Sequence, residues 1–378
     1  MSKYWNERVR KLEPYVPGEQ PRNRKFIKLN TNENPYPPSP NVIEAIRRAA
    51  GDSLRLYPDP SCTELREAVA ARYGVTVDQV FPGNGSDEAL AFAFAAFFAT
   101  PEDGANAPPA LFPDITYSFY PVYARLWNAP FETAPLADDF SINVNDYLRP
   151  SGGIILANPN APTGLALPLE ELRRLIEYQK EQGKVMVVDE AYGAFAAGNK
   201  TLSAVPLTAR YPNLLTVHTL SKSASLAGLR VGFAIGSEEL IQGLCRVRDS
   251  FNSYTLDRLA LAGAAAAIAD VNYYDELSRR IIATRERVSV ELRGMGFLVI
   301  PSSANFIFIS LPGKPGAEAF AALRERGILT RHFNTPRISD YLRVSIGTDG
   351  EMDRFLEACR ALAEGPRVIP SSQSTRHF

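Results

Sequence analysis

One segment of the sequence combines a lysine, two hydroxyls and an arginine directly after an apolar run. In LLTVHTLSKSASLAGLR, residues 214–230, the run leads into Thr219, Ser221 and Lys222, and Arg230 ends the segment. Nearby positive charge lowers the pKa of a lysine amine, which favours attack on an aldehyde to form a Schiff base. An arginine beside hydroxyls suits an anion. Taken alone, the segment also fits a lysine in an exposed loop.

Two further apolar runs end in polar residues. In VMVVDEAY, Asp189 follows four apolar residues and Tyr192 lies three positions later. A buried carboxylate needs a cationic or hydrogen-bonding partner, although an aspartate here could also cap a helix. The run GIILANPNAPTG, residues 153–164, ends in a turn rich in Asn, Pro and Gly.

The segment GNGSDEA, residues 83–89, has the composition of a helix start. Free backbone amides and the helix dipole favour a phosphate there, although most glycine-rich helix starts only cap. The four segments are more specific together than separately. A lysine for an aldehyde, a carboxylate for a pyridinium nitrogen, a tyrosine for a phenolic oxygen and a helix start with an arginine for a phosphate match pyridoxal 5'-phosphate.

The elements that must position these groups alternate along the chain. We expect strands at 153–157, 185–188 and 214–220, with an amphipathic helix at 168–182. Helices are predicted to begin near residue 41, to span 63–73, and to continue as an apolar helix up to residue 99. Apolar strands separated by helices indicate a parallel sheet covered on both faces. Ligands bind at the carboxyl ends of such strands, where the reactive residues stand.

The pattern changes after residue 237. Long helices are predicted at 238–250, 256–268 and 271–294, followed by a strand at 304–310, a helix at 316–326, a strand at 341–346 and a helix at 350–363. The proline-rich first 40 residues favour an extended arm. We therefore expect an arm and start of a small domain at 1–40, a large cofactor-binding domain at 41–250, a small α+β domain at 251–365 and a flexible tail at 366–378.

Composition excludes several classes of function. The chain carries 41 basic and 42 acidic residues, a net charge of −1, so nothing draws it to nucleic acid or to a membrane surface. The apolar run at 89–99 is too short to span a bilayer. The scattered Cys62, Cys245 and Cys359 argue against a disulfide framework and against a metal site. A reducing compartment, the cytoplasm, is expected.

From about residue 10 to 363 the sequence resembles the fold-type I pyridoxal-phosphate aminotransferases of classes I and II, and in particular the histidinol-phosphate aminotransferase family. The segments that carry the resemblance occur in the family's order: PYVPGEQP, KLNTNENPYPPSP, YPDP, GNGSDEA, TYSFY, NPNAPTG, VVDEAY, TLSKSASLAGLR, SANFIF and LRVSIGT. The resemblance implies a large α/β domain with a mostly parallel sheet between helices, a smaller α+β domain and a homodimer as the active unit.

The resemblance also implies roles for residues around the cofactor. Lys222 would bind the cofactor and move the α-proton of the substrate, Asp189 would pair with the ring nitrogen, and Tyr192 would hydrogen-bond the phenolic oxygen. Tyr117 would stack on the ring, and Tyr57 would reach the phosphate of the neighbouring subunit. The phosphate would otherwise be held by Gly85, Ser86, Asp87, Thr219, Ser221 and Arg230.

For the substrate, the resemblance implies that Arg331 and Arg343 bind anions, since a guanidinium grips a carboxylate or phosphate with two bonds. Tyr15 of the arm would close the pocket, together with Asn32 or Asn34.

The sequence departs from the family pattern at two places. Ala161 stands where the family has an asparagine that donates to the phenolic oxygen. Either Asn160 supplies that contact or Tyr192 makes it alone. At 250–252 the sequence reads SFN in place of the family's PYN, which affects the wall around Asn252.

The expected activity is transfer of an amino group between L-histidinol phosphate and 2-oxoglutarate. An aminotransferase for aromatic amino acids is the nearest alternative, because Tyr15, Tyr117 and Phe119 would suit such donors. A lyase that decarboxylates a phosphorylated amino acid is a second. A ligand-sensing domain of a transcription factor is a third, which the lack of a basic helix-turn-helix pattern disfavours.

Overall fold

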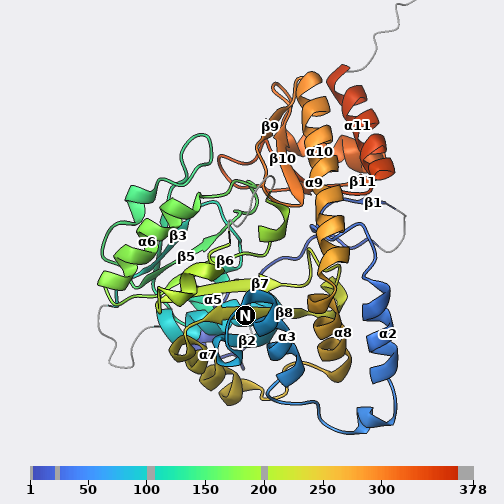
Figure 1. Cartoon of the computed structure of the whole chain (residues 1–378). Helices are drawn as coiled ribbons and strands as arrows, with labels where there is room; N and C mark the ends of the chain where they lie inside the picture. The colour runs from blue at the N-terminus through green and yellow to red at the C-terminus, as the bar shows by residue number, and fades with distance from the viewer. Residues whose placement is uncertain (1–2, 22–25, 100–106, 197–202, 365–378) are drawn as a thin grey trace, which may run out of the picture.

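The computed structural model describes residues 3–21, 26–99, 107–196 and 203–364. Within these ranges the larger of two units is built on a seven-stranded sheet of order β2-β8-β7-β6-β5-β3-β4 (Figure 1). Its strands are β2 (Val80–Asn84), β3 (Ala110–Pro113), β4 (Phe131–Ala134), β5 (Gly153–Ala157), β6 (Met186–Asp189), β7 (Leu214–Thr219) and β8 (Val231–Gly236). Only β8 runs antiparallel to its neighbours in this sheet. The predicted mostly parallel α/β fold is confirmed.

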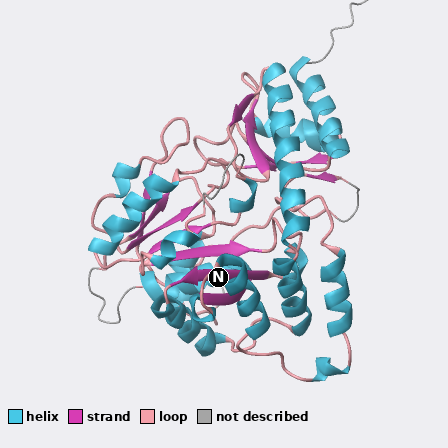
Figure 2. Cartoon of the chain, viewed as in Figure 1, coloured by secondary structure: helices cyan, strands magenta, loops and turns pink. Residues whose placement is uncertain are grey.

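Helices cover both faces of the sheet (Figure 2). Side chains alternate along a strand, so Val187 packs with one layer while its neighbours Met186 and Val188 pack with the other. The first layer holds α4 (Gly85–Ala93), α5 (Tyr120–Leu126) and α7 (Glu238–Phe251). The second holds α2 (Pro40–Ala49), α3 (Thr63–Tyr73), α6 (Leu169–Glu181) and α8 (Arg258–Ala269). Burial on both faces explains why β5 and the first three residues of β6 are apolar.

The smaller unit is an antiparallel sheet packed against three helices. Its strands are β9 (Leu298–Ile300), β10 (Phe306–Ser310), β12 (Arg331–His332) and β13 (Leu342–Ser345), and its helices are α9 (Val271–Gly294), α10 (Gly316–Glu325) and α11 (Asp349–Glu364). β1 (Ile27–Lys28) pairs with β11 (Ile328–Leu329), which joins the N-terminal segment to this unit. No helix of the described ranges is long and apolar enough to cross a membrane.

Helix α8 belongs with the large unit. Its residues Ala260 and Ala264 are buried in one cluster with Val42 of α2, Val69 of α3 and Val231 of β8. The same cluster also includes Tyr274 and Leu277 of α9, so the packing of the large unit extends past residue 251, where the boundary between the domains is expected. The expected tail at 366–378 lies outside the described residues.

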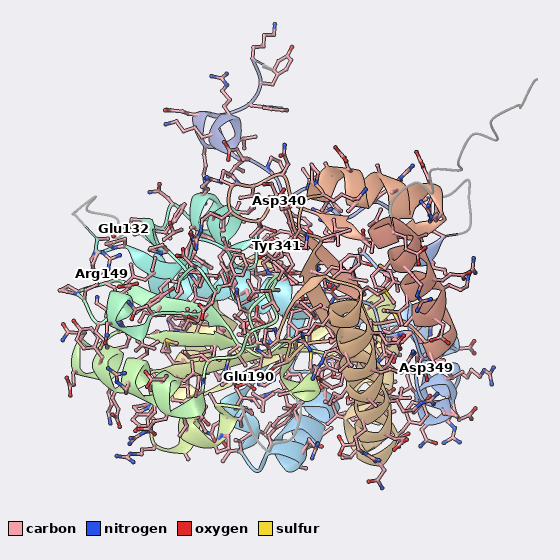
Figure 3. All side chains as sticks on the ribbon, turned by 90° about the horizontal axis from the view of Figure 1, so that it is seen from above. Glu132, Arg149, Glu190, Asp340, Tyr341 and Asp349 are labelled. Atoms are coloured by element: carbon pink, nitrogen blue, oxygen red, sulfur yellow. The ribbon has the colours of Figure 1, made fainter. Side chains whose placement is uncertain are left out.

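The N-terminal arm connects the two units. Its short helix α1 (Glu7–Lys11) stands off the body of the molecule in the view from above (Figure 3). Glu13 pairs with Arg125 of the large unit at 3.0 Å, and Glu19 pairs with Arg324 of the small unit at 2.7 Å. The residues between these two ion pairs thus span from one unit to the other.

Candidate functional site

A cavity of about 100 Å³ lies at the carboxyl ends of β5, β6 and β7. It is lined by Ser86, Asp87, Tyr117, Ala157, Ala161, Asp189, Ala191, Tyr192, Thr219, Ser221, Lys222 and Arg230. Parallel strands end at the same edge of the sheet, so residues far apart in the sequence meet there. The structure therefore brings most of the predicted cofactor-binding residues into one cavity.

Lys222 is the one amine on the described wall of this cavity. Its Nζ donates to the carbonyl oxygen of Thr31 at 3.1 Å. Burial, and then the positive charge of Arg343, lower the pKa of Lys222 to about 8. A larger fraction of this amine is therefore neutral near pH 7 than for an ordinary lysine, and the neutral amine is the nucleophile.

This lowered pKa predicts how the reactivity of Lys222 depends on pH. We expect the rate of Lys222 modification by trinitrobenzenesulfonate in the cofactor-free protein to rise through a midpoint near pH 8, because only the unprotonated amine reacts. An unperturbed lysine would show a midpoint near 10.4. Mass spectrometry of the Lys222 peptide at successive pH values measures the midpoint. A midpoint above pH 10 contradicts the prediction.

Asp189 ends β6 and is 4% exposed. Its Oδ1 accepts the Ala191 N–H at 3.1 Å, and its Oδ2 accepts the hydroxyl of Tyr120 at 3.0 Å. Burial raises the pKa of Asp189 to about 6, while these two donors and the charge of Lys222 act in the opposite direction. Tyr120 is not among the residues predicted from the sequence, although it is the last residue of the TYSFY segment. The site thus contains a carboxylate that a cation would stabilise.

A corner of the cavity is suited to a phosphate. Arg230 donates from Nη1 to Ser221 Oγ at 3.3 Å and from Nη2 to Asp87 Oδ2 at 2.9 Å. Helix α4 begins beside it at Gly85, whose φ of +75° and whose closeness to Arg230 leave no room for a side chain. Backbone amides at a helix start and a guanidinium are the donors that phosphates prefer.

Gly232 in β8 allows the start of α4 to lie against the sheet. A Cβ at Gly232 would overlap backbone atoms of Gly85, Ser86 and His218. We expect Gly232→Ala to lower the free energy of unfolding by about 3 kcal/mol, because backbone atoms cannot move aside as a side chain can.

Gly228→Ala is the matched control, since nothing lies within 4 Å of a Cβ there. Thermal denaturation of the two variants measures the difference, and equal midpoints would contradict the prediction.

The small unit contributes two arginines. Arg343 on β13 donates from Nη2 to the carbonyl oxygen of Asn30 at 3.1 Å, while its buried Nε has no hydrogen-bond partner among the described residues. Arg331 is its cross-strand neighbour on β12. Both guanidinium groups lie 5.6 Å from the ring centre of Phe333. A buried, incompletely bonded guanidinium is prepared to receive an anion.

The N-terminal arm and the segment after β1 lie on the same side of the site as these two arginines. Asn32 Nδ2 donates to the hydroxyl of Tyr192 at 3.0 Å, whereas Asn34 Nδ2 donates to the backbone carbonyls of Lys222 and Ser223. Of the two asparagines considered, Asn32 is therefore the one beside the cavity. Tyr15 stacks on Phe119 with ring centres 4.2 Å apart.

Asn160 and Tyr57, both predicted to bind the cofactor, lie outside the cavity. The amide of Asn160 donates to the Ile115 carbonyl at 3.0 Å and its carbonyl accepts from Thr116 at 2.8 Å, so both ends are held by the segment that follows β3. Ala161 lines the cavity instead. This geometry argues against the predicted contact from Asn160. Tyr57 is 78% exposed and stacks on Tyr254 at 4.5 Å, away from the cavity of its own chain.

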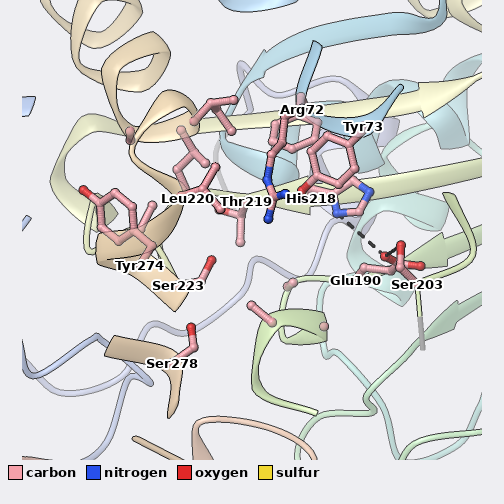
Figure 4. A pocket seen from close by; sticks show the side chains of 18 of the residues that line it. Arg72, Tyr73, Glu190, Ser203, His218, Thr219, Leu220, Ser223, Tyr274 and Ser278 are labelled. Carbon is pink, nitrogen blue, oxygen red and sulfur yellow. Dashed lines mark hydrogen bonds and ion pairs between the residues drawn. The ribbon is translucent and has the colours of Figure 1, made fainter. Parts of the chain in front are cut away.

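A larger cavity of about 340 Å³ lies behind the same strand ends (Figure 4). Inside it, His218 Nδ1 lies 3.8 Å from Glu190 Oε2, and burial lowers the pKa of His218 to about 3. The Glu190 carboxyl accepts from Ser203 Oγ at 2.7 Å. No lysine lies among the described residues that line this cavity. The smaller cavity, which holds Lys222, is the better candidate for chemistry.

Comparison with known proteins finds a matching family model, similar sequences and a similar structure. A model of the family "Aminotransferase class I and II" matches residues 24–359. The chain is 55% identical over 357 residues to a histidinol-phosphate aminotransferase of Clostridium acetobutylicum, covering 94% of this chain and 98% of that one. It is 54% identical to histidinol-phosphate aminotransferase 2 of Gluconobacter oxydans, covering 99% and 100%.

A solved structure is also similar. The histidinol-phosphate aminotransferase of Sinorhizobium meliloti, in complex with pyridoxal-5'-phosphate, has a TM-score of 0.83 and 26% identity, and the match covers 96% of this chain and 98% of that one.

Proposed function

The chain belongs to the class I and II aminotransferases, and on that basis we propose that it transfers an amino group between L-histidinol phosphate and 2-oxoglutarate, with pyridoxal 5'-phosphate as cofactor. The products are imidazole acetol phosphate and L-glutamate, which places the reaction in histidine biosynthesis. The observation that carries the proposal is the position of Lys222 in one cavity with Asp189 and Arg230. The names of the relatives at 55% and 54% identity support the choice of substrate.

The residues present fit this cofactor. Asp189 is a buried carboxylate without a cationic hydrogen-bond partner among the described residues, which suits a protonated ring nitrogen. Arg230 and the start of α4 suit the phosphate, and the ring of Tyr117 lines the cavity. When bound, pyridoxal 5'-phosphate supplies an electron sink for the bonds at the substrate's α-carbon.

Lys222 is the residue that moves the proton. Its Nζ, with a pKa of about 8, can accept a proton from the α-carbon and donate one again near neutral pH. Tyr192 and Asn32 form a donor pair beside it, with a bond of 3.0 Å between them. In the absence of a contact from Asn160, Tyr192 would hold the phenolic oxygen alone.

Arg343 and Arg331 bind the anionic ends of both substrates in this proposal. One half-reaction brings a phosphate and the other brings carboxylates, and a guanidinium accepts either with two bonds. Tyr15 covers the pocket through its contact with Phe119. The arm's ion pairs to both units would hold this cover in place.

A panel of amino donors tests the proposal. Purified protein with pyridoxal 5'-phosphate is assayed with L-histidinol phosphate, with aromatic amino acids and with a phosphorylated amino acid, each with and without 2-oxoglutarate. The highest kcat/KM is expected for L-histidinol phosphate, with turnover only when 2-oxoglutarate is present. A preference for aromatic donors would support the first alternative, and turnover without an acceptor would indicate a lyase.

We further propose that the active unit is a homodimer in which Tyr57 reaches the phosphate site of the partner subunit. Tyr57 is 78% exposed and stacks on Tyr254, and the nearby Leu54 and Leu56 are exposed as well. Exposed apolar side chains close together favour association with another chain.

Mixed dimers test the role of Tyr57. Lys222→Ala and Tyr57→Ala chains are each expected to be nearly inactive, but a dimer of one of each has one intact site. Co-refolding equal amounts should restore about a quarter of wild-type activity, since half the dimers are mixed and each has one working site. No recovery would indicate that Tyr57 acts within its own chain.

We also propose a reducing location, the cytoplasm. Its support is that Cys62, Cys245 and Cys359 are all free thiols, of which Cys62 and Cys359 are buried.

A further inference from the structure

Tyr120 forms a hydrogen bond with one oxygen of the Asp189 carboxylate. Its hydroxyl donates to Asp189 Oδ2 at 3.0 Å, while Oδ1 accepts the backbone N–H of Ala191 at 3.1 Å. We propose that Tyr120 is a positioning residue for Asp189. Its hydrogen bond fixes the orientation of the Asp189 carboxylate and weakens the hold of this carboxylate on the proton that it shares with the ring nitrogen of the cofactor. This inference rests on the proposed cofactor site and not on the identity of the amino donor.

The position of the Tyr120 hydroxyl is fixed by packing. The side chain is 0% exposed. Its ring meets Tyr117 edge to face with centres 5.7 Å apart and Phe112 in the same manner at 5.8 Å. Close packing on two sides restricts the rotation of this buried ring. The hydroxyl therefore stays directed at Asp189 without an entropic cost at the moment of cofactor binding.

Tyr120 acts as a permanent donor. Burial, and then the charge of Asp189, raise the pKa of Tyr120 well above its ordinary value, so the hydroxyl keeps its proton throughout the working pH range. The ionised form of Asp189 is favoured by donors and by the charge of Lys222, and is opposed by burial and by Asp87.

Removal of this donor should shift a shared proton. Without the Tyr120 hydroxyl, the Asp189 carboxylate is more basic, because a hydrogen bond to the charged form is lost. The proton between Asp189 and the ring nitrogen then moves toward the carboxylate. A less protonated ring withdraws fewer electrons, so the step that removes the α-proton becomes slower.

The chain offers a matched control in the same helix. Tyr123 is buried like Tyr120, but its hydroxyl donates to Asp87 Oδ1 at 3.2 Å instead of Asp189. Tyr120→Phe and Tyr123→Phe each remove one buried hydroxyl and keep the ring. A general loss of packing or stability would affect both variants, whereas loss of control over Asp189 affects only Tyr120→Phe.

The test uses the enzyme reconstituted with pyridoxal 5'-phosphate labelled with ¹⁵N in the ring. In Tyr120→Phe the ¹⁵N resonance is expected to move toward the unprotonated position, and kcat should fall about tenfold, the effect of one pKa unit. The KM for the amino donor should stay close to that of the wild type. Tyr123→Phe should leave the ¹⁵N resonance in place. An unchanged resonance in Tyr120→Phe, or an equal shift in both variants, would overturn the inference.

A second variant allows the test to be made even if Tyr120→Phe does not fold. Incorporation of 3,5-difluorotyrosine at position 120 keeps the hydroxyl and makes it a stronger donor, so the ¹⁵N resonance should move toward the protonated position. A shift in the other direction, or none, counts against the role of Tyr120. Failure of the wild-type protein to bind the cofactor would instead refute the proposed function.

Discussion

Replacing Lys222 with alanine is expected to abolish transamination, with a fall in kcat of roughly 10⁴-fold or more. Two functions should be lost together, because in the proposed mechanism the same Nζ binds the cofactor and moves the proton at the α-carbon. Substrate binding should be much less affected, since the anion-binding groups Arg331 and Arg343 lie on separate strands of the small unit.

The measurement is spectroscopic as well as kinetic. The wild-type protein with pyridoxal 5'-phosphate should show a visible absorbance that borohydride reduces, with the reduced cofactor attached to the peptide that contains Lys222. Lys222→Ala should lack both. Lys180→Ala is the control, because Lys180 is an exposed residue of α6. Survival of the reducible absorbance in Lys222→Ala would refute the assignment of this lysine.

The sequence predicts most of the elements whose periodicity is clear. The helices at 63–73 and 271–294 and the strand at 153–157 agree with α3, α9 and β5 to the residue. The strands β2 and β8 escaped detection because they contain residues typical of turns. Pro82 and Gly83 lie inside β2, which is an edge strand where a missing N–H is tolerated. Gly232 and Gly236 interrupt the apolar pattern of β8.

The cofactor side of the site is more predictable than the substrate side. Asp189 directly follows one predicted strand, and Lys222 lies shortly after another. Because both strands end at the same edge of the sheet, the two residues come together. Arg343 is placed by the pairing of β13 with β10 and by the packing of a second unit, which no local pattern encodes. Asn160 shows the opposite case, since its type and position suit the cofactor but its amide is bonded to the carbonyl of Ile115 in the segment after β3.

The net charge of the chain does not indicate the local group of positive charges in the site. The net charge is −1, yet Lys222, Arg230 and Arg343 gather around one crevice. Only Arg230 has a carboxylate partner within the described structure, Asp87 at 2.9 Å. Asp87 and Asp189 in the same cavity offset part of this positive charge, and a bound anion would offset more of it. We therefore expect anions to be attracted to this crevice and not to the surface as a whole.

Among the residues proposed to bind substrate, Arg343 is expected to have the largest effect on kcat/KM. Arg343→Ala is expected to lower kcat/KM by about 100- to 1000-fold for L-histidinol phosphate and for L-glutamate alike, because two charge-assisted hydrogen bonds are lost in each case. Arg343→Lys should recover little of this loss, because an ammonium cannot form the paired bonds of a guanidinium.

A measurement of thermal stability distinguishes the loss of anion binding in Arg343→Ala from misfolding. Arg343 has no ion-pair partner within the described structure, and its buried Nε is unbonded. Its removal relieves the cost of burying a charge, so the thermal midpoint of Arg343→Ala should equal or exceed that of the wild type. Arg326→Ala, on the exposed end of α10, is the control for loss of a surface arginine. If Arg343→Ala lost activity with L-histidinol phosphate but kept full activity with L-glutamate, the two half-reactions would not share this arginine, and recognition of the carboxylate would fall to Arg331.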